Sequence, residues 1–415
     1  MAHQAHNLPW KLLADNFKYR YENTSCKCQT NLFPSKIPQL ETDLSYFAKA
    51  FKRTIDEHSK IERSKYAENY DPPKGDEEVF SEAIAEKIKC TLRQSEERGA
   101  KIRSMKVLEN RKISFWFNLM PHRGEDNCRP LHNTLEPIKV LLLHSEMDVL
   151  LRLASHHALN LGRAWERPFN EEKDYGLKAF VYPTFMVYIC LNILLQKPEL
   201  YDEESRKIYM RTPRRDVPVI KHESHLDYRL TRAYQLTLLY CTQPTTQTLP
   251  HQVFFGLSHQ LDLHKFNERC GHMPFARFKS AADNGVYSPH QDDIAKVMRI
   301  LMGKGLPAEL CLDVIEFADY TPSRRMTTAD DPLHMDNSCE LRKYLKYCWQ
   351  LLVRVDMLMR LKNEEIDWEH AVKECVWRLF IERSNGVLKL RRRESAPHLA
   401  IDDRTMAFCS CCYLL

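Results

Sequence analysis

Residues 179–195, AFVYPTFMVYICLNILL, are the stretch of the chain that decides its fold. These 17 residues carry no formal charge, and Lys178 and Lys197 flank them. A membrane-spanning helix needs about 20 predominantly apolar residues and tolerates few polar ones. This run contains a proline, a threonine, two tyrosines and an asparagine. It is therefore predicted to be a helix buried in a protein core, with insertion into a membrane as the alternative.

Apolar residues at helical spacing recur on both sides of this run. Leu44, Phe47, Phe51 and Ile55 are three or four residues apart, which is the pattern of one helix face buried against a core. Similar patterns cover residues 77–108, 135–161, 225–241, 252–266, 292–302, 307–320, 339–361 and 367–382. Strand signals are sparse, and residues 217–220 are the best short candidate. The sequence predicts an all-α, multi-helix globular protein, with two packed helical domains as one arrangement.

The composition excludes several classes of protein. Glycine occurs only 11 times in 415 residues, which argues against a β-sandwich, a propeller or a glycine-lined nucleotide fold. The 61 basic and 56 acidic side chains leave a net charge of +5, too close to balance to indicate a nucleic-acid partner. No hydrophobic signal segment is seen in residues 1–13, so we expect a cytoplasmic protein with reduced thiols.

We expect four regions along the chain. Residues 1–120 are predicted to be an N-terminal helical region and residues 121–303 a central apolar helical domain. Residues 304–385 follow as a C-terminal helical segment, and residues 386–415 as a basic, cysteine-rich flexible tail. Stretches rich in proline, glycine or polar residues separate the helical regions, because proline cannot continue a helix.

The tail carries a candidate lipidation signal. Cys412 is the fourth residue from the end and, with Tyr-Leu-Leu after it, fits the C-a-a-X prenylation pattern, whose terminal leucine favours a geranylgeranyl group. One prenyl chain anchors weakly, so a second signal is needed. Cys409 and Cys411 are candidates for palmitoylation, and Lys389 and residues 391–393 form a basic cluster upstream. We expect peripheral attachment to the cytosolic face of a membrane; a chance match is the alternative.

A second candidate site begins at Leu306 and Pro307, where proline starts a new helical pattern. Leu310, Val314 and Phe317 are predicted to be the buried stripe of that helix. The segment resembles the opening of an F-box, and the apolar positions from Leu341 to Leu352 resemble its closing helix. The resemblance implies a ubiquitin-ligase adaptor in which Leu306, Pro307, Leu310 and Val314 contact Skp1. The polar insert between the two parts is longer than in an F-box, and any helix can start in this way.

More broadly, segments of the C-terminal third resemble uncharacterised filamentous-fungal proteins. The resemblance is carried by residues 306–310, 331–334 and 347–352. It implies a eukaryotic, cytosolic setting and no particular activity.

The one dense group of metal-ligating residue types is formed by His222, His225, Cys270 and His272. Two histidines three residues apart can share a helix face, and the later pair could complete a tetrahedral zinc site. The spacing matches no established zinc signature, and His-Glu-Ser-His is one residue shorter than the metalloprotease pattern. Surface or capping roles are the alternative, and no other cofactor is expected.

These features favour a non-enzymatic interaction or scaffold protein, anchored at a membrane by the prenylated tail. Two alternatives stay open at this point. One is an F-box-like adaptor, and the other is a metal-dependent helical enzyme that uses the histidine and cysteine group.

The lipidation hypothesis makes a direct prediction. Cys412→Ser removes the thiol that a prenyltransferase modifies, so we expect the variant to leave the membrane pellet and to lose labelling by an isoprenoid probe. Unchanged fractionation of wild type and variant, with no labelling of either, would contradict the hypothesis.

Overall fold

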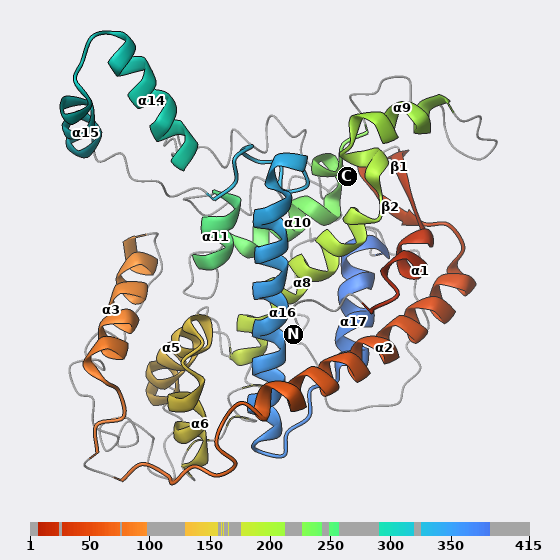
Figure 1. The fold of residues 1–415 in the computed structure, drawn as a ribbon. Helices are drawn as coiled ribbons and strands as arrows, with labels where there is room; N and C mark the ends of the chain where they lie inside the picture. Colours follow the sequence, from red (N-terminus) through yellow and green to blue (C-terminus); the bar gives the residue numbers. More distant parts are fainter. Residues whose placement is uncertain are drawn as a thin grey trace, which may run out of the picture.

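The computed structural model describes residues 7–24, 27–74, 77–97, 129–156, 159, 161, 165, 176–211, 226–242, 249–256, 290–318 and 325–381 (Figure 1). Its longer helices are α2 (Ile37–Arg63), α3 (Glu82–Glu97), α5 (Arg129–His144), α8 (Leu177–Leu195), α14 (Gln291–Gly303) and α16 (Ser338–Arg360). The shorter ones are α1 (Trp10–Asp15), α6 (Met147–Ser155), α9 (Glu203–Arg211), α10 (Arg232–Cys241), α11 (Leu249–Phe255), α15 (Ala308–Phe317) and α17 (Trp368–Val376). The predicted, mainly helical fold class is confirmed.

Helix α8 is the predicted apolar run, and it lies at the centre of the fold. Its residues are apolar around the whole circumference, so the helix has to be covered on all sides. Helices α1, α10, α16 and α17 contact it, and Figure 1 shows α16 crossing in front of it. Among the described residues it is the one helix long and apolar enough to cross a membrane, yet most of it is buried inside the protein.

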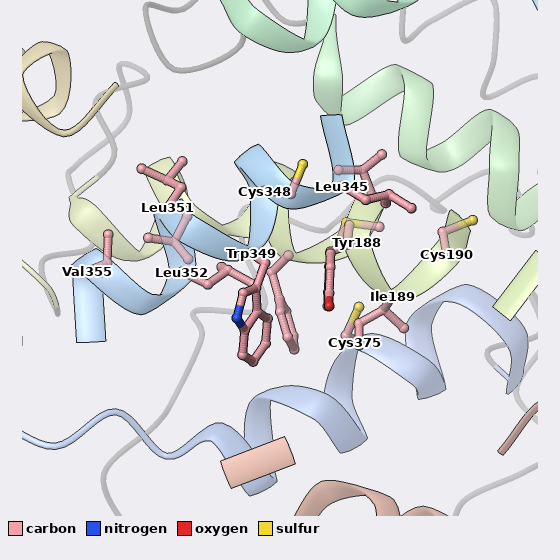
Figure 2. Close-up of a cluster of buried hydrophobic side chains, with 14 of the residues drawn as sticks. Tyr188, Ile189, Cys190, Leu345, Cys348, Trp349, Leu351, Leu352, Val355 and Cys375 are labelled. Carbon is pink, nitrogen blue, oxygen red and sulfur yellow. The ribbon is translucent and has the colours of Figure 1, made fainter. Parts of the chain in front are cut away.

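Aromatic side chains join the helices around α8. The ring of Phe51 on α2 lies 5.6 Å from that of Phe185 on α8, 5.5 Å from Trp349 on α16 and 5.9 Å from Trp368 on α17. All four side chains are buried. Tilted and edge-on ring pairs of this kind add to the free energy gained by burying their area. Figure 2 shows the neighbouring part of the core, where the rings of Tyr188 on α8 and Trp349 on α16 lie beside each other, 5.4 Å apart.

A buried carboxylate lies at the side of this aromatic cluster. Asp356 on α16 is fully buried and accepts hydrogen bonds from Trp368 Nε1 at 2.8 Å and from Arg360 Nε at 2.7 Å. Arg360 also contacts Asp56 on α2. A buried charge destabilises a fold unless it is paired and hydrogen-bonded. These contacts satisfy Asp356 and tie α2, α16 and α17 together.

The structure adds a hairpin that the all-α prediction did not include. Strands β1 (Phe17–Thr24) and β2 (Lys27–Pro34) pair antiparallel, from Phe17 opposite Pro34 to Thr24 opposite Lys27. Asn31 attaches the hairpin to the helical body. Its Nδ2 donates to the Leu379 carbonyl at 2.9 Å, and its Oδ1 accepts from the Ala233 amide at 3.3 Å. The predicted strand candidate at 217–220 lies outside the described residues.

One hydrophobic cluster takes side chains from α2, α8, α10, α16 and α17. Its members therefore come from three of the four predicted regions, 1–120, 121–303 and 304–385. The boundaries between those regions stay a prediction, and the tail at 386–415 lies outside the described residues.

We predict that Phe51→Ala lowers the free energy of unfolding by about 3–5 kcal/mol, because it removes ring contacts with three helices and leaves a cavity. Tyr46→Ala on the same helix is the control. Tyr46 is 60% exposed, so its loss should change stability by no more than about 0.5 kcal/mol. Denaturant titration of both variants tests this, and similar effects would contradict the role given to Phe51.

Candidate interaction surface

Helices α14 and α15 form a hairpin that projects from the helical body, at the upper left of Figure 1. A capping box starts α14. His290 Nδ1 accepts from the Asp292 amide at 3.1 Å, and Asp293 Oδ2 accepts from the His290 amide at 2.9 Å. After α14 the chain turns at Gly305, whose φ of +92° is a conformation that side-chain-bearing residues rarely adopt. Pro307 then precedes α15.

The two helices pack on each other through one face of each. Cys311 on α15 is fully buried, and Ile315 on the same helix is half-buried. On α14 the half-buried positions are Ile294, Val297, Met298 and Leu301. No residue of α14 is fully buried, so the contact between the helices is shallow and large parts of both reach solvent.

The predicted stripe of α15 is exposed, so the prediction that it would be buried was wrong. Leu310 is 51%, Val314 44% and Phe317 97% exposed. The helix instead turns Cys311 toward its neighbour. Leu306 is half-buried and Pro307 is exposed. The expected closing helix of an F-box, residues 341–352, lies in α16 inside the hydrophobic core. Periodicity identified an apolar face correctly but assigned it to the interior.

Charged side chains of opposite sign are exposed on the two helices of the hairpin. Glu309, Asp313 and Glu316 on α15 are exposed, and each immediately precedes one residue of the stripe in sequence. On α14 the exposed side chains include Lys296 and Arg299. We call Leu310, Val314 and Phe317 the hairpin stripe, and these five charged residues its rim.

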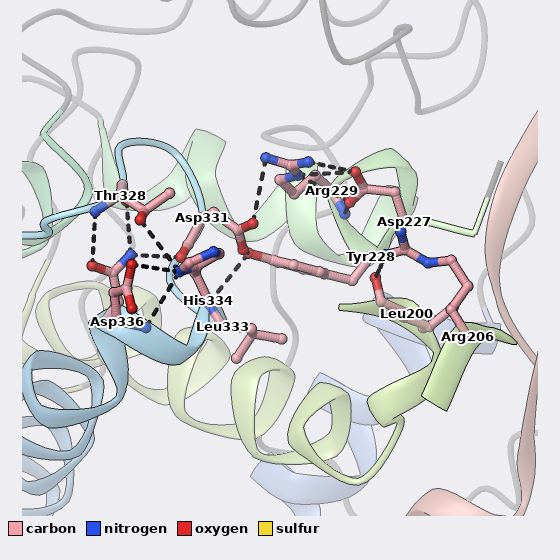
Figure 3. A network of polar contacts seen from close by, with 11 residues as sticks. Leu200, Arg206, Asp227, Tyr228, Arg229, Thr328, Asp331, Leu333, His334 and Asp336 are labelled. Atoms are coloured by element: carbon pink, nitrogen blue, oxygen red, sulfur yellow. Dashed lines mark hydrogen bonds and ion pairs between the residues drawn. The ribbon is translucent and has the colours of Figure 1, made fainter. Parts of the chain in front are cut away.

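A polar network fixes the segment that leads from the hairpin to α16 (Figure 3). Arg229 binds the Asp227 carboxylate with two nitrogens, at 3.0 and 2.7 Å, and lies 3.7 Å from Asp331. The buried Tyr228 hydroxyl donates to Asp331 Oδ1 at 2.6 Å. Asn337 donates to the Asp331 carbonyl at 2.7 Å. Because the guanidinium is shared between both carboxylates, we interpret this network as structural, and we call it the Asp331 clamp.

A second network lies deep in the core. His251 on α11 is fully buried, with Nδ1 2.6 Å from the Tyr344 hydroxyl and Nε2 3.1 Å from Thr184 Oγ1. Phe254 stacks on Tyr344 with the ring centroids 3.7 Å apart. Burial lowers the pKa of His251 to about 3, so the imidazole is neutral at physiological pH. The network connects α8, α11 and α16, and it was not predicted from the sequence.

The other predicted site residues lie outside the described part of the chain. This holds for the metal candidates His222, His225, Cys270 and His272, and for the lipidation candidates Cys409, Cys411 and Cys412. Among the residues that the structure does describe, no group of three or more histidine, cysteine, aspartate or glutamate side chains could hold a metal ion. Both sites stay predictions.

His251 makes folding sensitive to acid. Its pKa is about 3 in the folded protein and about 6.5 when unfolded, so the stability it contributes is complete above pH 6.5 and is lost as the pH falls toward 3. We predict that wild type loses up to about 1.4 kcal/mol more per pH unit than His251→Gln in this range. Denaturant titrations between pH 6.5 and 5 measure the difference.

The control is His370→Gln, which alters an exposed histidine of α17 and should keep the wild-type dependence of stability on pH. An equal dependence in all three proteins would contradict the prediction.

Comparison with known proteins gives one match. No curated protein and no solved structure matches the chain. The sequence model of a family described as "Gramillins biosynthetic cluster protein GRA5" matches residues 11–393. The match includes α14, α15 and the Asp331 clamp, whereas the three tail cysteines lie beyond it. The family is fungal, in agreement with the resemblance to filamentous-fungal proteins. Because the match covers most of its length, the chain belongs to the family of the gramillins biosynthetic cluster protein GRA5.

Proposed function

We propose that this protein is a non-enzymatic interaction protein of a biosynthetic cluster, and that it binds a protein partner through the α14–α15 hairpin. The observation that carries the proposal is the exposure of the hairpin stripe. Phe317 alone leaves 97% of its surface in contact with solvent. A run of exposed large apolar side chains, bordered by charged residues, is typical of a surface that another molecule covers.

The spacing of the stripe indicates how a partner would bind. Leu310, Val314 and Phe317 are separated by four and three residues and therefore lie on one side of α15. Helices that insert into a partner use anchors at this spacing. Burying one such side chain contributes roughly 1.5–3 kcal/mol, before the entropic cost of association is subtracted. Three anchors together can supply a useful binding free energy.

The description of the family indicates the setting in which an interaction protein would act. It refers to a biosynthetic cluster, in which several gene products contribute to one metabolite. An interaction protein could act there by bringing other cluster proteins together. The F-box resemblance suggests a different partner, the Skp1 adaptor, for the same two side chains, Leu310 and Val314. The apolar side chains of residues 341–352 are buried in α16 and leave α15 without its expected closing helix. We therefore prefer a cluster protein to Skp1 as the partner.

A cross-linking experiment tests the proposal in a fungal host that expresses the cluster. We expect tagged wild type to be cross-linked to cluster proteins and Leu310→Glu/Val314→Glu to lose most of these links, because a charge in each anchor position opposes burial. The matched control is Ile61→Glu on α2, since Ile61 and Leu310 are both 51% exposed.

The control variant should keep the wild-type cross-links. Links that survive in the double variant would contradict the proposed surface. Conversion of a cluster intermediate by the purified protein would contradict the non-enzymatic function. If Skp1 is the one partner that the double variant no longer cross-links, the F-box interpretation is the better one.

A further inference from the structure

We propose that the hairpin stripe is covered by the α14–α15 hairpin of a second copy of this chain, so that two hairpins form a four-helix bundle. This inference rests on the proposed function, because it names the partner of the same surface. It follows from the distribution of apolar and charged side chains over the two helices.

Helix α15 presents an apolar stripe and an acidic stripe side by side. Glu309 precedes Leu310 and Glu316 precedes Phe317, with Asp313 and Val314 forming the pair between them. One residue advances a helix by about 100°, so the acidic stripe runs parallel to the apolar one on the adjacent face. A partner that covers the stripe must therefore present apolar groups with positive charge beside them.

Helix α14 has this complementary pattern. Ile300 is a large apolar residue that is 62% exposed. Lys296 and Arg299 are exposed on the same helix, four residues and one residue before Ile300. The acidic residues of α14 are confined to its first turn, where Asp292 lies 3.5 Å from His290 and Asp293 lies 3.5 Å from Lys296. The rest of its exposed charge is positive.

A two-fold symmetric dimer pairs the acidic stripe of α15 with the basic residues of α14. In a symmetric dimer, α15 of each copy meets α14 of the other, and the same contact occurs twice. The apolar stripe then meets Ile300, while the acidic residues of α15 face Lys296 and Arg299 on α14 of the other copy. Pairing α15 with its own copy would instead place three carboxylates opposite three carboxylates, and like charges across an interface are repelled. Four-helix bundles are a stable way to bury such helix faces.

Charge reversal in the full-length protein tests the pairing by light scattering after size-exclusion chromatography. Wild type should elute as a dimer whose dissociation constant rises with salt, because screening weakens the charged rim. Lys296→Glu/Arg299→Glu makes both helices acidic, and Glu309→Lys/Asp313→Lys makes both basic. Each variant alone should dissociate at least about tenfold more readily, since like-charge contacts cost several kcal/mol.

The decisive sample is an equimolar mixture of the two variants, whose opposite charges should restore a dimer. The control is Lys49→Glu/Arg53→Glu, which reverses two exposed charges on α2 and should remain dimeric. Circular dichroism confirms that each variant is folded. A wild type that is monomeric at every concentration, a dimer unaffected by either reversal, or a mixture that stays monomeric would overturn the inference.

These outcomes are separate from those of the proposed function. If wild type is monomeric but Leu310→Glu/Val314→Glu still loses its cross-links to other proteins, the hairpin binds a different partner and only the second copy is excluded. If the cross-links are also unaffected, both proposals fail.

Discussion

The rest of the structure depends on the need to cover α8 on every side. Between Lys178 and Lys197 the chain offers no charged side chain that could face water, so the helix is stable in aqueous solution only inside a shell. Helices from distant parts of the sequence supply much of that shell, together with the nearer α10. α1 precedes α8 by more than 150 residues, and α16 and α17 follow it by about as many. The fold is therefore organised around one segment rather than built up from local hairpins.

A polar residue inside α8 helps to place a neighbouring helix. Most buried hydroxyls find a hydrogen-bond partner, and Thr184 finds one in His251, which in turn contacts Tyr344. This chain of contacts fixes where α11 lies between α8 and α16. Thr184, one of the residues that argued against a membrane span, thus helps to set the position of a neighbouring helix. Asn192 is satisfied locally by the Tyr188 carbonyl, 2.8 Å away.

Sequence periodicity predicted the helices and one buried face well. Leu44, Phe47, Phe51 and Ile55 are all buried, as their spacing indicated. On α15 the same reasoning failed, because spacing shows which residues share a face and not whether another element covers it. The β-hairpin was missed although buried Phe17 and Tyr19 alternate with exposed Lys18. The His251 network could not be predicted, since its partners are 67 and 93 residues away along the chain.

The Asp331 clamp lies between the α14–α15 hairpin and the helical core along the chain. It holds the chain to the body between α15 and α16, through Arg229, Tyr228 and Asn337. Along the chain, these contacts of Asp331 come after α15 and before the first turn of α16. Substitutions on the hairpin stripe therefore leave the clamp and the packing around α8 unchanged, because the stripe shares no residue with either.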